Sequence, residues 1–164
     1  MDILKPKKVV TSISNIDLDS YWLTGKRGII IDLDNTIIPW DNSIVNEDAH
    51  NLLIKALTCH YKIFILTNAG EIRTQDIANQ YGIPYIAHAI KPRKSVYLKA
   101  LDLMELKPHQ VIVIGDQIFT DILGGNIAGC YTILVPAISK REFIGTKILR
   151  LFEKIINNNT VNKV

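Results

Sequence analysis

Residues 28–36 read Gly-Ile-Ile-Ile-Asp-Leu-Asp-Asn-Thr, a run of isoleucines that ends in two aspartates two positions apart. A short run of β-branched residues is typical of a strand buried on both faces of a parallel sheet. Ligands of open α/β sheets bind at the carboxyl ends of such strands, so Asp32 and Asp34 are expected at a ligand site. Two adjacent carboxylates in a low-dielectric site are costly unless a cation or a proton is shared between them. The pattern therefore predicts a magnesium-dependent carboxylate site.

Three later segments add polar side chains after apolar runs or before a proline that can start a helix. Taken singly, each could cap a helix, lie in a solvated turn or be a charge favoured by a helix N-terminus. Four such segments in one order favour a catalytic site instead. The residues concerned are Thr67 and Asn68 after residues 62–66, Lys91 before Pro92, and Asp116 and Asp121 after the apolar run that begins at Val111.

The four segments resemble, in order and spacing, the signature motifs of the haloacid dehalogenase (HAD) superfamily of phosphotransferases. Over roughly residues 1–155, the chain further resembles the YqeG family of subclass IIIA, which is similar to the mitochondrial phosphatidylglycerophosphate phosphatases. Residues 69–71 depart from the family pattern, in which a further polar residue often follows Asn68. The likeness is carried by residues 32–36, Pro39, Trp40, Lys91, Pro92, and residues 115–117, 120–121 and 123–126.

The resemblance implies a phosphomonoester hydrolase that depends on Mg²⁺ and forms an aspartyl-phosphate intermediate. It implies that Asp32 is the nucleophile and that Asp34 is the general acid and base, a residue typical of phosphatases rather than of dehalogenases or P-type ATPases. A carboxylate can attack phosphorus when a metal ion offsets the repulsion between the two anions. The implied metal ligands are Asp32, Asp116 and the backbone carbonyl of Asp34, hard oxygen donors that suit magnesium better than zinc. Asp121 is expected near the metal, where it would orient a bound water or Lys91.

The phosphate-binding side of the site is expected to involve a hydroxyl, an amide and several cations. By the same resemblance, Thr67 gives its hydroxyl and its backbone N–H to phosphate oxygens, and Lys91 supplies positive charge. Asn68 either contacts substrate or makes a hydrogen bond within a turn. Arg93 and Lys94 follow Lys91 closely, so we expect them to bind a second anionic group of the substrate. The rim of the site is expected to carry Trp40, Arg73, Arg93 and Lys94.

Strand and helix signals alternate along the chain. Apolar residues recur at helical spacing in four segments, and short apolar runs lie between them. This alternation predicts an α/β fold, namely a HAD-like Rossmannoid three-layer α/β/α sandwich with a parallel sheet. The predicted helices span residues 47–58, 71–81, 95–104 and 120–128.

The spacing of the motifs argues against a cap domain. About thirty residues separate Thr36 from Thr67, and about two dozen separate Thr67 from Lys91, which in each case suffices for one helix and its connections. We therefore expect no cap domain and an open site, with Asp32 and Asp34 exposed to solvent. Water would then be excluded by the substrate, a neighbouring subunit or the membrane surface.

Length and composition indicate one domain, since the chain has 164 residues and a hydrophobic fraction of 48%. We expect an N-terminal segment over residues 1–27, the HAD-like domain over residues 28–156 and a flexible tail over residues 157–164. A net charge of +3 without a block of like charges does not favour a nucleic-acid partner. The apolar stretches have strand length, so we expect a cytoplasmic protein. Residues 143–156 have an amphipathic pattern that suits either peripheral membrane contact or packing on the sheet.

Three functional alternatives are consistent with these features. The leading one is hydrolysis of phosphatidylglycerophosphate, in which an open site receives the phospholipid headgroup while the acyl chains stay in the bilayer. The second is a phosphatase of a soluble sugar or nucleotide phosphate, with a neighbouring subunit of an oligomer acting as the cap. The third is a non-catalytic HAD-fold interaction module, against which the intact set of Asp32, Asp34, Lys91 and Asp116 argues.

Overall fold

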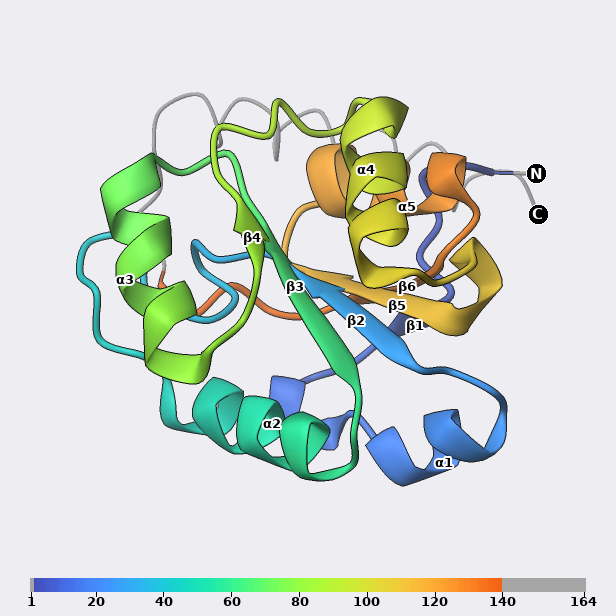
Figure 1. The fold of residues 1–164 in the computed structure, drawn as a ribbon, viewed down its shortest axis with the longest axis horizontal. Helices are drawn as coiled ribbons and strands as arrows, with labels where there is room; N and C mark the ends of the chain where they lie inside the picture. Colours follow the sequence, from blue (N-terminus) through green and yellow to red (C-terminus); the bar gives the residue numbers. More distant parts are fainter. Residues whose placement is uncertain (1, 140–164) are drawn as a thin grey trace, which may run out of the picture.

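The computed structural model describes residues 2–139, which form a parallel six-stranded sheet between two layers of helices (Figure 1). The strands lie in the order β1-β6-β5-β2-β3-β4, and each neighbouring pair is parallel. The predicted three-layer α/β/α sandwich is therefore confirmed. The strands are β1 (Lys8–Val9), β2 (Gly28–Ile31), β3 (Lys62–Leu66), β4 (Tyr85–Ile86), β5 (Val111–Gly115) and β6 (Tyr131–Leu134).

Helices connect the strands and cover both faces of the sheet. Two predicted helices have the bounds expected from sequence. Of the helix expected over residues 120–128, the first three residues belong to a π-helical turn that begins at Ile118, and the α-helix starts at Leu123. The helices are α1 (Leu18–Leu23), α2 (Glu47–Thr58), α3 (Glu71–Tyr81), α4 (Lys94–Met104) and α5 (Leu123–Ala128), with the short turns η1 (Ile13–Asn15), η2 (Pro108–Gln110) and η3 (Ile118–Ile122).

Alternation along the central strands divides the interior into two cores. In β2, Ile29 and Ile31 belong to the core that includes residues of α2 and α3, whereas Ile30 belongs to the core that includes residues of α4. Successive side chains of a strand point to opposite faces, so one isoleucine run supplies both cores. Helices α2 and α4 lie on opposite faces of the sheet (Figure 1). Each buried isoleucine contributes about 1.5–3 kcal/mol relative to an exposed one. The apolar run thus anchors β2 in the centre of the sheet.

Local signals explain where the helices that flank the site begin and end. At the start of α2, the side chain of Asn46 accepts hydrogen bonds from the N–H groups of Asp48 and Ala49. At the end of α3, Gly82 adopts a left-handed conformation with φ of 63°, which glycine tolerates without strain. Asn46 thus begins α2 after the loop from the carboxyl end of β2, and Gly82 ends α3 just before the turn that leads to the amino end of β4.

The N-terminal residues add a strand to the sheet, since Lys8 and Val9 of β1 pair with Ile133 and Leu134 of β6. The division into an N-terminal segment, a domain and a tail stays a prediction. The amphipathic segment over residues 143–156 and the tail over residues 157–164 lie outside the described residues.

No cap domain is inserted in either of the two segments that separate the motifs. Between Thr36 and Thr67 the chain forms α2 and its connections, and between Thr67 and Lys91 it forms α3 and β4, all within the described residues. Among residues 2–139, none of the helices combines the length and the hydropathy needed to cross a bilayer.

Candidate active site

The predicted acidic residues meet because their strands are neighbours. Asp32 directly follows β2, and Asp116 directly follows β5. In the sheet, Ile31 pairs with Ile114, and the N–H of Asp32 donates to the carbonyl of Ile114 at 3.0 Å. Thr67 follows β3, the neighbour of β2 on the other side. The carboxyl ends of three adjacent strands therefore carry predicted site residues.

Three buried aspartates form a cluster at this edge. Carboxylate oxygens of Asp32, Asp116 and Asp121 all lie within 4.8 Å of one another. Asp121 comes from the π-helical turn η3 after β5, and it lies against the backbone of Gly115. A Cβ atom on residue 115 would overlap the carboxylate of Asp121. Glycine at that position thus allows Asp121 to approach the end of β5 closely.

Lys91 bridges two of these aspartates. Its Nζ donates to Asp32 Oδ1 at 2.5 Å and to Asp121 Oδ1 at 2.7 Å, and the Lys91 side chain is only 3% exposed. Burial alone would lower the pKa of Lys91, but the carboxylates of Asp121 and Asp32 outweigh it, and the pKa lies above the ordinary value. The lysine is therefore positively charged at neutral pH.

The side chain of Asn68 positions the backbone that carries Lys91. Asn68 Oδ1 accepts a hydrogen bond from the N–H of Lys91 at 2.8 Å. This hydrogen bond joins residues 23 positions apart, so it is a contact between two loops and differs from the hydrogen bond within a turn that was one of the two roles considered for Asn68. Contact between Asn68 and the substrate stays a prediction.

Asp121 is held from two sides. Besides Lys91, its Oδ2 accepts from the N–H of Gln117 at 3.2 Å. Burial raises the pKa of Asp121, while the Lys91 ammonium opposes that rise and the Asp32 carboxylate adds to it. These contacts fix the orientation of the carboxylate toward Asp32.

The charge of the cluster fits a divalent cation. The cluster contains three buried carboxylates and one buried ammonium, which pairs with Asp32 and Asp121, so it is short of positive charge when all of its groups are ionised. A bound divalent metal ion would supply that charge, and carboxylate oxygens suit hard cations such as Mg²⁺. The residues present therefore fit a metal ion, with Asp32, Asp116 and Asp121 as the available side-chain donors.

Asp34 lies outside this cluster and has a different partner. Its Oδ1 accepts from Arg73 Nε on α3 at 2.9 Å, and its side chain is 27% exposed. Burial raises the pKa of Asp34, as does the carboxylate of Asp32, whereas Arg73 opposes the rise. Arg73 was expected only on the rim. A signal for the contact between Arg73 and Asp34 was present in the sequence. Arg73 lies in the first turn of α3, where the helix dipole disfavours a cation, so a nearby acidic group is expected to offset its charge.

One expectation for Thr67 is wrong. Its backbone N–H donates to the carbonyl of Ile86 at 3.1 Å and is therefore not available to a phosphate oxygen. The parallel pairing of β3 with β4 continues one residue beyond β3, which explains the difference. The side-chain Oγ1 accepts from the N–H of Ala69 at 3.0 Å, which leaves the hydroxyl hydrogen as the group that Thr67 can donate.

The expected openness of the site is correct for Asp34 but wrong for Asp32. Asp32 is only 6% exposed, because Lys91 and Asp121 pack against it. Arg93 and Lys94 are exposed where α4 begins, close in sequence to the buried Lys91. Their predicted role toward a second anionic group remains a prediction.

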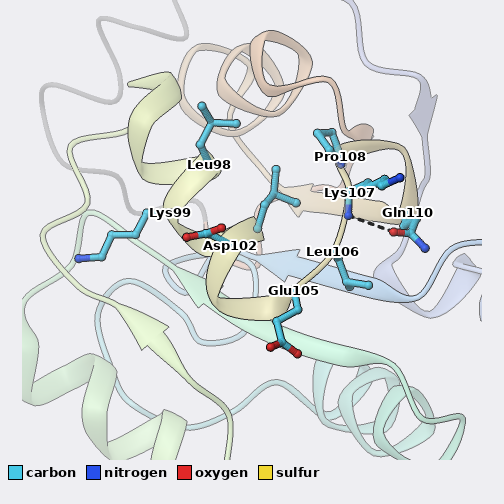
Figure 2. Close-up of a pocket in the computed structure, with 9 residues that line it drawn as sticks. Leu98, Lys99, Asp102, Glu105, Leu106, Lys107, Pro108 and Gln110 are labelled. Carbon is cyan, nitrogen blue, oxygen red and sulfur yellow. Dashed lines mark hydrogen bonds between the residues drawn. The ribbon is translucent and has the colours of Figure 1, made fainter.

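A hollow of about 710 Å³ lies away from this cluster, between the C-terminal half of α4 and the turn before β5 (Figure 2). Its lining includes Leu98, Leu106 and Pro108. The hollow adjoins Gln110, which precedes β5, whereas Asp116 follows β5. It is therefore at the amino end of the strands, opposite to the acidic cluster.

The chain is similar to known proteins over most of its length. The HAD-hydrolase-like family model matches residues 88–140. The chain is 34% identical over 151 residues to the probable phosphatase YqeG of Bacillus subtilis, which covers 92% of this chain and 88% of that protein. It is 25% identical over 170 residues to the mitochondrial phosphatidylglycerophosphatase GEP4 of Saccharomyces cerevisiae, covering 95% of this chain and 89% of that protein.

A solved structure supports the fold independently of close sequence similarity. The HAD-superfamily hydrolase from Ehrlichia chaffeensis has a TM-score of 0.57 at 18% identity, covering 80% of this chain and 98% of that one. The topology, the motifs at the strand ends and the similarity over nearly the whole chain lead to one conclusion. This chain belongs to the YqeG family of HAD-superfamily phosphatases.

Proposed function

We propose that the protein is a Mg²⁺-dependent phosphomonoester hydrolase that acts through an aspartyl-phosphate on Asp32. The observation that carries the proposal is the buried cluster of Asp32, Asp116 and Asp121 with Lys91 at the carboxyl ends of adjacent strands. An anionic substrate needs positive charge at such a site, and the cluster can hold a divalent cation beside the lysine.

In the first step, a carboxylate oxygen of Asp32 attacks the phosphorus of the ester. The bond between phosphorus and the leaving oxygen breaks, and protonated Asp34 donates its proton so that an alcohol leaves. Lys91 holds Asp32 in place and offsets the charge on the phosphoryl oxygens, and the Thr67 hydroxyl donates to one of them. The product of this step is the alcohol and an acyl phosphate on Asp32.

In the second step, Asp34 takes a proton from a water molecule as the water attacks the phosphorus. The bond between phosphorus and Asp32 breaks, which releases inorganic phosphate and restores the carboxylate. Asp32, Asp116 and the backbone carbonyl of Asp34 would hold a Mg²⁺ ion, which would supply charge that reduces the repulsion between the two anions. Asp121 keeps Lys91 oriented toward Asp32.

The substrate proposed here is phosphatidylglycerophosphate. The name of the yeast relative supports this choice, and the partial exposure of Asp34 suits a substrate that is bound by its headgroup alone. Such a lipid carries a phosphodiester beside its terminal phosphate, and the exposed Arg93 and Lys94 would bind that second anionic group. A lipid substrate implies peripheral contact of the protein with a membrane surface.

A substrate panel tests the proposal. The full-length protein is assayed for phosphate release from phosphatidylglycerophosphate in mixed micelles, from glycerol 3-phosphate and from sugar and nucleotide monophosphates, with and without Mg²⁺. The expected result is Mg²⁺-dependent release with the lipid as the best substrate. Preference for a soluble ester would overturn the lipid assignment, and no hydrolysis of any ester would support a non-catalytic module.

Variants test the residue roles. Asp32→Asn should abolish turnover and the hydroxylamine-labile phosphoenzyme while thermal stability stays level or rises, because a costly buried charge is removed. The control is Asp102→Asn, since Asp102 is exposed on α4 and adjoins the hollow at the opposite end of the sheet. Retained turnover in Asp32→Asn would rule out the covalent mechanism.

The proposed site for the second anionic group of the substrate is tested by removing its positive charges. The double variant Arg93→Ala, Lys94→Ala should raise KM for phosphatidylglycerophosphate but not for p-nitrophenyl phosphate. The matched control is the double variant Lys99→Ala, Lys107→Ala, which removes two exposed cations from the opposite end of the sheet. Unchanged KM for the lipid would refute the anchoring role.

A further inference from the structure

The guanidinium of Arg73 joins α3 to the loop that follows β2. Its Nε donates to Asp34 Oδ1 at 2.9 Å, and its Nη2 donates to the carbonyl of Pro39 at 2.6 Å and to that of Trp40 at 3.2 Å. Its Nη1 lies 3.4 Å from the hydroxyl of Ser43, a longer contact. One side chain thus contacts the proposed general acid and the backbone of its loop together.

The loop itself is a tight turn around Asn35. The N–H of Asn35 donates to the carbonyl of Ile38 at 2.7 Å, and its side-chain oxygen accepts from the N–H of Trp40 at 3.3 Å. Asn35 has φ of 61°, a left-handed conformation that asparagine tolerates better than most residues. Arg73 bonds to the carbonyl groups at the end of this turn, so it ties the turn to α3.

From these contacts we infer that Arg73 is a positioning residue that holds the carboxyl group of Asp34 toward the leaving oxygen of the substrate. This inference rests on the proposed function. Arg73 contacts Asp34 through a single bond, from Nε to Oδ1, while its Nη2 is bonded to the loop carbonyls. The contact occupies Oδ1, so we assign the transfer of the proton to Oδ2. The side chain of Arg73 is 25% exposed, so the pair lies at the edge of the site rather than within the buried cluster.

A residue that positions a general acid has a signature that a structural residue lacks. The leaving oxygen of an alkyl ester needs a proton from the general acid, whereas p-nitrophenolate is a good enough leaving group to depart without one. Loss of Arg73 should therefore slow formation of the phosphoenzyme from an alkyl ester and have little effect on its formation from an aryl ester. General loosening of the fold would slow both reactions alike.

The experiment measures the rate of phosphoenzyme formation under single-turnover conditions with Mg²⁺. The two probes are glycerol 3-phosphate and p-nitrophenyl phosphate. In Arg73→Ala we expect a loss of about 30-fold with glycerol 3-phosphate, which corresponds to about 2 kcal/mol in activation free energy. With p-nitrophenyl phosphate the loss should stay within about 3-fold, and KM for both esters should change by less than about 2-fold.

Three further variants sharpen the test. In an Asp34→Asn background, Arg73→Ala should add less than about 2-fold, because the acid that it positions is already absent. Arg73→Lys keeps the charge and a donor, so it should recover part of the lost rate, and it carries the test if the alanine variant does not fold. Ser43→Ala is the control that removes the longest of the four contacts, and it should react at close to the wild-type rate with both esters.

Equal losses with the two esters, no loss with either, or an undiminished effect in the Asp34→Asn background would overturn the positioning role. Wild-type protein that forms no phosphoenzyme with either ester or with phosphatidylglycerophosphate in mixed micelles would instead overturn the proposed function, and this inference with it. Failure of the inference alone is recognised by an active wild type whose Arg73 variants do not discriminate between the esters.

Discussion

Replacing Lys91 by methionine removes the buried cation of the acidic cluster while keeping a flexible side chain of similar length. Lys91 pairs with Asp32 at 2.5 Å and with Asp121 at 2.7 Å, and with 3% exposure it leaves little room for water to take its place. Removing one partner of a buried ion pair costs about 3–5 kcal/mol, because the other charge stays buried without compensation. We expect a loss of that size in the free energy of unfolding of the metal-free protein at pH 7.5. A loss of about 4 kcal/mol lowers Tm by roughly 12 °C.

The loss should depend on pH in a defined direction. Burial already raises the pKa of Asp121, and the Lys91 ammonium is the group that opposes this rise. In Lys91→Met, the folded-state pKa of the clustered carboxyls should rise further above the unfolded-state value. An acid with a raised folded-state pKa destabilises the fold fully above that pKa, and the penalty declines as the pH falls from the folded-state pKa toward the unfolded-state pKa. The difference from wild type should therefore shrink between pH 7.5 and pH 5.

The assay is urea-induced unfolding in EDTA at the two pH values, with and without Asp121→Asn in the same chain. Asp121→Asn should restore part of the stability of Lys91→Met, because one uncompensated charge is removed. The matched control is Lys94→Met at an exposed position, which should change stability by less than about 0.5 kcal/mol. A loss below about 1 kcal/mol at pH 7.5, or an equal loss at both pH values, would refute the view that Lys91 compensates this cluster.

Three other predictions address the same region and the core. Gly115→Ala should lower the free energy of unfolding by about 1–3 kcal/mol and reduce phosphatase activity, since the new Cβ would displace the carboxylate of Asp121. Urea unfolding and turnover measure the two effects, and wild-type values in both would contradict the close contact. Mg²⁺ added to EDTA-treated protein at 100 times its Kd should stabilise the fold by about 2.7 kcal/mol, and in thermal melts Asp116→Ala should show a smaller rise in Tm than wild type. An equal rise in Tm in that variant would exclude Asp116 as a ligand. Cys59 should react with a thiol reagent in the native protein at pH 8, whereas Cys130, which is buried and has its pKa raised to about 12, should react only after unfolding. Rapid labelling of both thiols would show that the core around Cys130 opens readily.

Local patterns were sufficient to predict the central strands, most helices and the edge of the sheet that carries the site. The isoleucine run of β2 faces two cores because its residues alternate, and Asp32 follows it directly, so both the strand and the position of the aspartate could be predicted. The bounds of α3 were predicted because apolar spacing and Gly82 are local signals. Short gaps between motifs predicted the lack of a cap at two positions. In each case the information lies in one strand, in one helix with its end, or in the number of residues between two motifs.

Sequence by itself therefore determined the fold class, the family and the set of acidic residues at the strand ends. Tertiary structure decided which of them meet and what surrounds them. Asp32, Asp116 and Asp121 form one cluster because β2 and β5 are adjacent in a particular register, and Asp34 is left to Arg73, which is 39 positions away in sequence. These outcomes depend on the pairing of distant segments and on side-chain reach across the loops between them, and neither quantity is encoded in the local periodicity of the chain.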